Sequence, residues 1–172
     1  MSEAFTAYFP NITNANGNNL GAILNQSKDE VLKIQRIGIA GNFVDTSGTH
    51  TTNLISIRRY TLAGLTGYTY VTPVSHDLAN VVPDTTIISY GGTPTGTFEV
   101  LRNVIYSTDE RVLADFEWGQ WSLIVPWNIV WDAGYLDSTV QPLTLRAFEM
   151  VCVWHTNVAS QESDLWIEFL RE

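Results

Sequence analysis

Short apolar runs recur along nearly the whole chain, separated by clusters of glycine, proline, asparagine and threonine. Runs of this length between turn residues are typical of strands in an all-β domain, and no stretch predicts a core-packed helix of three turns. Residues 97–106 fit a helical face as well as a strand, and their β-branched side chains favour the strand. We expect strands at residues 31–40, 54–60, 68–71, 84–90, 97–106, 121–130, 141–155 and around 165–169.

About eight short strands with turn-rich connections predict an all-β fold, a two-sheet antiparallel β-sandwich that is jelly-roll-like. A closed barrel of eight up-and-down strands is the alternative, but the uneven spacing of the runs favours the sandwich. The length of 172 residues suits one such domain. Its core should contain the alternating or clustered apolar residues Ile34, Ile37, Ile39, Ile55, Ile57, Val151 and Val153.

Residues 1–21 differ from the rest because they are rich in asparagine and small side chains. Phe5, Tyr8 and Phe9 are the sizeable apolar groups of this stretch. We expect an extended N-terminal arm over residues 1–21, too poor in apolar groups to fold alone, and a sandwich domain over residues 22–172. The three aromatic side chains would then contact a neighbouring subunit or another partner.

Charge and cysteine content exclude several classes of protein. Nine basic and eighteen acidic residues give a formal charge of −9, which argues against a nucleic-acid partner because phosphate binding needs clustered lysine and arginine. The single cysteine, Cys152, excludes an intramolecular disulfide, and we expect it to be a small buried hydrophobe. The N terminus lacks the pattern of a signal peptide and no apolar run could span a bilayer, so we expect no membrane association.

The residues that could carry chemistry are scattered. The three histidines lie near different turns or strand ends, and no nucleophile elbow, phosphate-binding glycine loop or zinc-ligand spacing accompanies them. Acidic residues near the tryptophans leave a glycosidase-like pair or a calcium site as weaker alternatives, with the candidates Asp109, Glu110, Asp115, Glu117, Asp132 and Asp137. We therefore expect a non-enzymatic protein with no catalytic residue, no metal site and no cofactor.

Four of the six tryptophans lie between residues 118 and 131. Most large aromatic residues belong to cores, and those that do not are enriched at the centres of subunit interfaces. With the aromatic residues of the arm, the candidate interface comprises Phe5, Tyr8, Phe9, Trp118, Trp121, Trp131 and Tyr135.

Three stretches carry a family resemblance: residues 71–77 (VTPVSHD), 104–110 (VIYSTDE) and 129–135 (IVWDAGY). In this order they resemble small virion structural proteins of tailed bacteriophages, of the capsid decoration or cement type. The resemblance implies a β-sandwich that binds the major capsid protein on the capsid exterior, as a homotrimer at local three-fold positions. It also implies synthesis in the host cytoplasm, and it supplies no catalytic residue.

We therefore expect a non-enzymatic capsid decoration protein that bridges capsid subunits and stabilises the phage head. The alternative is a tail- or fibre-associated virion protein that binds a host surface glycan. A glycan-active enzyme using Asp109, Glu110 or Asp132 is a third, weaker hypothesis.

Overall fold

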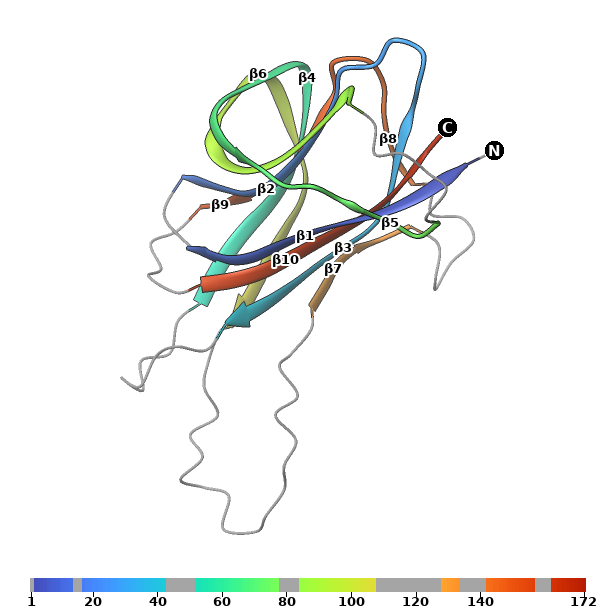
Figure 1. The fold of residues 1–172 in the computed structure, drawn as a ribbon. Helices are drawn as coiled ribbons and strands as arrows, with labels where there is room; N and C mark the ends of the chain where they lie inside the picture. Colours follow the sequence, from blue (N-terminus) through green and yellow to red (C-terminus); the bar gives the residue numbers. More distant parts are fainter. Residues whose placement is uncertain are drawn as a thin grey trace, which may run out of the picture.

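The computed structural model describes residues 2–13, 17–42, 52–77, 84–107, 128–133, 142–156 and 162–172. These residues form strands and turns and contain no helix, which confirms the predicted all-β class (Figure 1). The strands are β1 (Glu3–Thr13), β2 (Asn18–Asn25), β3 (Leu32–Asn42), β4 (Thr52–Tyr70), β5 (Val74–Ser75), β6 (Thr86–Ser107), β7 (Asn128–Asp132), β8 (Leu143–Leu145), β9 (Met150–His155) and β10 (Glu162–Arg171).

The strands form two antiparallel sheets, as predicted for a β-sandwich. The larger sheet has six strands in the order β5-β1-β10-β3-β7, with β8 also paired to β3. In the smaller sheet, β2, β6, β4 and β9 close into a ring. The chain ends in the larger sheet beside its own start, because β10 pairs with β1 from Glu3 to Thr13 (Figure 1).

The strand count and several boundaries differ from the prediction. The runs at 54–60 and 68–71 are parts of the long strand β4, and those at 84–90 and 97–106 are parts of β6. The run at 141–155 is two strands, since β8 pairs with β3 in the larger sheet and β9 lies in the smaller one. The chain crosses between the sheets in a turn at which Phe148 has a positive φ of 58°.

The paired strands β4 and β6 form one long ribbon that curls back on itself (Figure 1). The first part of β4 pairs with β9, whereas the first part of β6 pairs with β2, so the curl closes the ring. The ladder shifts between Thr61 and Gly64, opposite Gly96, whose φ is +112°. A Cβ at Gly96 would lie 2.6 Å from the Thr61 carbonyl oxygen, so the bend requires glycine there.

The main core lies between the two sheets, and all seven predicted core residues belong to it. A second, smaller cluster lies on the other face of β2 and β9, beneath the curled ribbon, and contains Ala22, Leu24, Tyr60, Met150 and Cys152. Cys152 is fully buried, as expected, and its thiol donates a hydrogen bond to Asn19 Oδ1 at 3.2 Å. Burial raises the pKa of this thiol to about 12, against a smaller lowering effect of Arg58.

The expectation of an arm over residues 1–21 is wrong. Residues Glu3–Thr13 form β1, which pairs with both β10 and β5 inside the larger sheet. The side chains of Phe5 and Phe9 are fully buried in the main core, and the Phe5 ring stacks on Phe169 with 5.4 Å between ring centroids. The proposed boundary at residues 21/22 therefore falls inside β2. The low apolar content misled because one face of β1, with Phe5, Ala7 and Phe9, is enough to fill the core, while the other face carries Thr6 and Tyr8.

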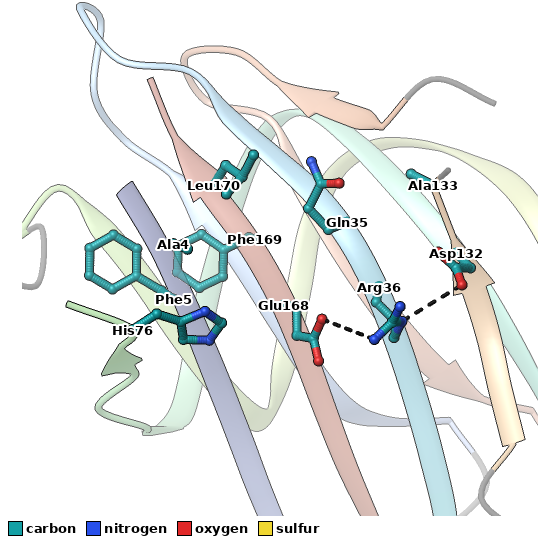
Figure 2. Close-up of a pocket in the computed structure, with 10 residues that line it drawn as sticks. All are labelled: Ala4, Phe5, Gln35, Arg36, His76, Asp132, Ala133, Glu168, Phe169 and Leu170. Carbon is teal, nitrogen blue, oxygen red and sulfur yellow. Dashed lines mark hydrogen bonds and ion pairs between the residues drawn. The ribbon is translucent and has the colours of Figure 1, made fainter. Parts of the chain in front are cut away.

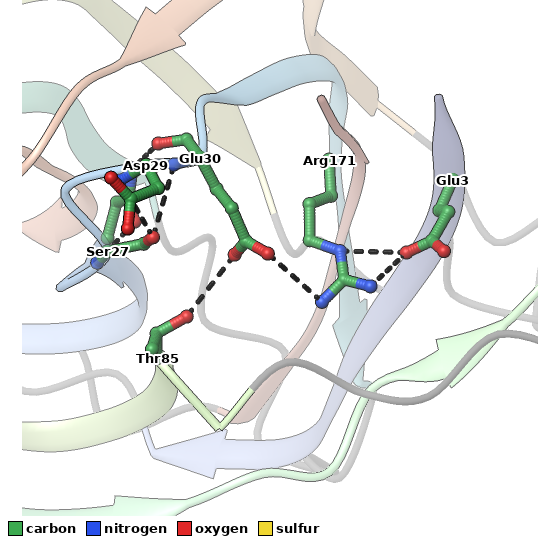
Figure 3. Close-up of polar contacts among 7 residues, drawn as sticks. Glu3, Ser27, Asp29, Glu30, Thr85 and Arg171 are labelled. Carbon is green, nitrogen blue, oxygen red and sulfur yellow. Dashed lines mark hydrogen bonds and ion pairs between the residues drawn. The ribbon is translucent and has the colours of Figure 1, made fainter. Parts of the chain in front are cut away.

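Polar contacts connect the sheets at one end of the sandwich (Figure 3). Arg171 on β10 is hydrogen-bonded and ion-paired to Glu3 on β1, and its Nη1 lies 3.6 Å from Glu30 Oε1. Glu30 also accepts a hydrogen bond from Thr85, at 3.3 Å, just before β6 begins. The Ser27 hydroxyl accepts hydrogen bonds from the backbone N–H groups of residues 29 and 30 and so shapes the turn that presents Glu30.

Candidate functional site on the outer face of the larger sheet

The outer face of the larger sheet carries two neighbouring rows of side chains with different chemistry. Residues 5–9 of β1 and residues 163–170 of β10 alternate between buried positions and positions that face away from the core. The outward residues of β1 lie directly opposite those of β10, which in turn lie opposite outward residues of β3. Such cross-strand rows are spaced by about 7 Å along the strands, because every second residue shares a face.

The first row is charged and polar. Thr6 lies opposite Glu168, which lies opposite Arg36, which lies opposite Asp132 on β7. The Arg36 guanidinium lies between the two carboxylates, with Nη1 3.5 Å from Glu168 Oε2 and Nε 3.7 Å from Asp132 Oδ2 (Figure 2). At the other end of the row, Thr6 Oγ1 and His76 Nε2 are 2.7 Å apart.

The second row is aromatic. Tyr8 lies opposite Trp166, which lies opposite Gly38. A Cβ at Gly38 would lie within 2.1 Å of three indole ring atoms, so the indole lies against the β3 backbone at a position that carries no side chain. The Tyr8 hydroxyl donates a hydrogen bond to Asp164 Oδ2 at 3.0 Å. Burial, followed by Asp164, raises the pKa of Tyr8 above its ordinary 10.0, so the phenol keeps its proton at neutral pH.

A shallow depression of about 330 Å³ opens beside the charged row (Figure 2). The side chains of Arg36, His76, Asp132 and Glu168 border it together with residues of β1, β3 and β10. Its volume lies at the lower end of the range of small-ligand sites. The arrangement can present hydrogen-bond donors and acceptors side by side next to a half-exposed aromatic surface.

The structure brings one of the predicted interface residues, Tyr8, to this face. Phe5 and Phe9 are buried in the chain's own core and cannot contact a partner, which corrects their assignment. Trp131 on β7 is partly buried and packs against the main core. The positions of Trp118, Trp121 and Tyr135 lie outside the described residues.

Arg36, Trp166 and Glu168 on this face were not among the predicted site residues. The alternation at 165–169 predicts a strand, but its outward residues form part of a site only because β1 and β3 lie on either side of β10. His76 directly follows Ser75, whose hydroxyl group is a potential nucleophile. The Ser75 hydroxyl instead donates to the carbonyl of residue 77 and accepts from its N–H group, which makes it part of a polar turn.

Other candidate chemistry is sparse in the part of the chain that the structure describes. Within those residues no group of three or more histidine, cysteine or acidic side chains is placed to hold a metal ion. No helix there is long and apolar enough to cross a bilayer. The carboxylate of Asp132 is engaged with Arg36, while the positions of Asp109, Glu110, Asp115, Glu117 and Asp137 fall outside the described ranges.

A second surface is the stretch from residue 97 to residue 105 of β6, here called the β6 edge. Among the described strands, β4 alone pairs with it. Phe98, Val100 and Ile105 on the β6 edge are all exposed apolar side chains. Exposed apolar strand edges are the places at which a sheet accepts a strand or a surface from another chain.

Comparisons with protein-family models, with curated proteins and with solved structures find no match to this chain.

Proposed function

We propose that this chain is a non-enzymatic structural protein of a phage virion, a capsid decoration or cement protein. It binds the major capsid protein on the capsid exterior as a homotrimer and stabilises the head by bridging capsid subunits. Two arguments support the proposal: the resemblance of residues 71–77, 104–110 and 129–135 to such proteins, and the β6 edge. The β6 edge is the observation that carries the protein–protein part of the proposal.

The β6 edge favours assembly because three of its apolar side chains are exposed on the surface of the chain. Ile105 is 70% exposed, and Phe98 and Val100 are exposed on the same strand. Removing apolar area from water stabilises an interface by about 25 cal/mol per Å². Covering these exposed side chains with another chain would therefore contribute favourable free energy to association. Glu99 and Arg102 on the same strand carry charges, which disfavour pairing of this edge with arbitrary strands and so favour a specific partner.

The test compares two variants that place a charge at equally exposed aliphatic residues. Ile105→Glu changes the β6 edge, whereas Val74→Glu, at a residue that is 68% exposed, changes β5 in the other sheet. We expect Ile105→Glu to abolish trimers in light scattering, leaving the 19.2 kDa monomer, and to lower occupancy on capsids. Val74→Glu should behave as the unmodified protein. Equal behaviour of the two variants would remove the β6 edge from the proposal.

Location in the virion needs its own measurement. Mass spectrometry of purified particles should find this chain at an abundance comparable with that of the major capsid protein, and stripped particles should melt at a lower temperature. A low copy number would instead favour the tail- or fibre-associated alternative. Absence from particles would contradict both.

A further inference from the structure

We propose that the outer face of the larger sheet binds a neutral oligosaccharide, with the sugar rings lying on Tyr8 and Trp166 and their hydroxyl groups hydrogen-bonded by the charged row. This site goes beyond the proposed role in the capsid and uses a different surface from the β6 edge. It rests on the two cross-strand rows of β1, β10 and β3.

The aromatic row supplies the stacking surface. Tyr8 is 46% exposed, and Trp166 beside it is half-buried, with its indole lying against Gly38. The exposed parts of the Tyr8 ring and of the neighbouring indole together form an aromatic surface on the outside of the sheet. The C–H face of a pyranose is apolar and slightly electropositive, which complements the negative face of an aromatic ring.

The charged row supplies the hydrogen bonds. Arg36 offers several N–H donors in a fixed plane, while Glu168 and Asp132 on either side of it offer acceptor oxygens (Figure 2). Adjacent hydroxyl groups of a sugar both donate and accept, so they fit between a guanidinium and a carboxylate without bringing any charge. His76 and Thr6 extend the row with a further donor–acceptor pair.

Charge and shape select this occupant over others. Arg36 is balanced by two carboxylates, and Asp164 adds a third beside Tyr8, in a chain whose formal charge is −9. An anionic ligand such as a phosphate or a sialylated glycan is therefore disfavoured. The depression is shallow and lies on a sheet, which suits a chain of sugar units that crosses the strands.

The experiment titrates the protein with hexaoses of glucose, mannose and N-acetylglucosamine and records amide NMR spectra. We expect at least one hexaose to shift resonances of β1, β10 and β3 around residues 8, 36, 166 and 168. Tyr8→Ala should weaken that binding roughly tenfold or more. Tyr70→Ala is the matched control, since Tyr70 is 50% exposed, makes one hydroxyl hydrogen bond and lies on the β4–β6 ribbon.

Glu168→Gln is a second variant. It replaces the carboxylate of the charged row by a neutral amide of nearly the same shape. It should also weaken hexaose binding while leaving the melting temperature nearly unchanged, because the Arg36–Glu168 pair is partly exposed. No shifts with any hexaose, shifts confined to other strands, or equal losses in Tyr8→Ala and Tyr70→Ala would each overturn the proposal. Binding of a lysine-rich peptide at this face without hexaose binding would overturn it in favour of a protein partner.

Discussion

Replacing Phe5 by alanine tests whether β1 is an integral strand of the domain. Its ring is fully buried, stacks on Phe169 at 5.4 Å and an interplanar angle of 19°, and lies 5.8 Å from the Arg171 guanidinium carbon. Truncating a buried phenylalanine costs about 3–5 kcal/mol through lost transfer free energy and the cavity that remains. We expect Phe5→Ala to lower the free energy of unfolding by an amount in this range. The cation–π contact with Arg171, at 5.8 Å, contributes little and is included in that amount.

The assay is urea unfolding followed by circular dichroism, with thermal melting as a second measurement. For a chain of this size a loss of 3–5 kcal/mol lowers the melting temperature by roughly 6–20 °C. Tyr8→Ala on the same strand is the control, because Tyr8 points away from the core and should cost about 1 kcal/mol or less through its hydrogen bond to Asp164. If Phe5→Ala costs no more than Tyr8→Ala, β1 is a detachable arm and the assignment of the core is wrong.

Three further perturbations have defined outcomes. Deleting residues 2–13 should abolish cooperative unfolding, because β10 loses the partner with which it pairs over most of its length; a normal melting curve would contradict this. Gly38→Ala should displace the indole of Trp166, change the tryptophan fluorescence and cost about 1–3 kcal/mol, and an unchanged spectrum and stability would show that the ring does not cover Gly38. The pKa of Cys152 is raised from 9.0 to about 12 on folding, so its contribution to stability is complete below pH 9 and is lost as the pH rises from 9 to 12. The free energy of unfolding of Cys152→Ala should therefore fall less over that interval than that of the unmodified protein, and an identical fall would refute the burial of the thiol.

Several parts of the fold could be predicted from local sequence because the signal needs no distant partner. Alternation and β-branched residues identified the strands at 31–40, 54–60 and 165–169, and the apolar residues in them form the core between the sheets. The merging of two expected strands into β4, and of two others into β6, could not be predicted. A glycine-rich stretch such as 91–96 looks like a turn in sequence but here continues a curled ribbon, since its positive φ values bend the strand without ending it.

The candidate site depends on strand pairing even more than the fold does, so less of it could be predicted from the sequence. Tyr8 was predicted as an interface residue, but Arg36 lies on a strand far in sequence from that of Trp166 and Glu168, and the three share no motif. Their chemistry arises from register, because a shift of one residue would send every one of these side chains to the other face of the sheet.

Local sequence patterns were enough to predict the all-β class, the apolar residues of the core, the burial of the single cysteine and the net negative charge. Each of these follows from composition or from a period of two residues, which are properties of a short segment. The tertiary structure alone decided that residues 3–13 belong to the domain, that β4 and β6 curl over a second core, and that two rows of side chains share one face. The first and third of these outcomes depend on the pairing of β10 with β1 and β3, which lie more than a hundred residues away in the chain, and the free energy of that pairing is not encoded in any one strand alone.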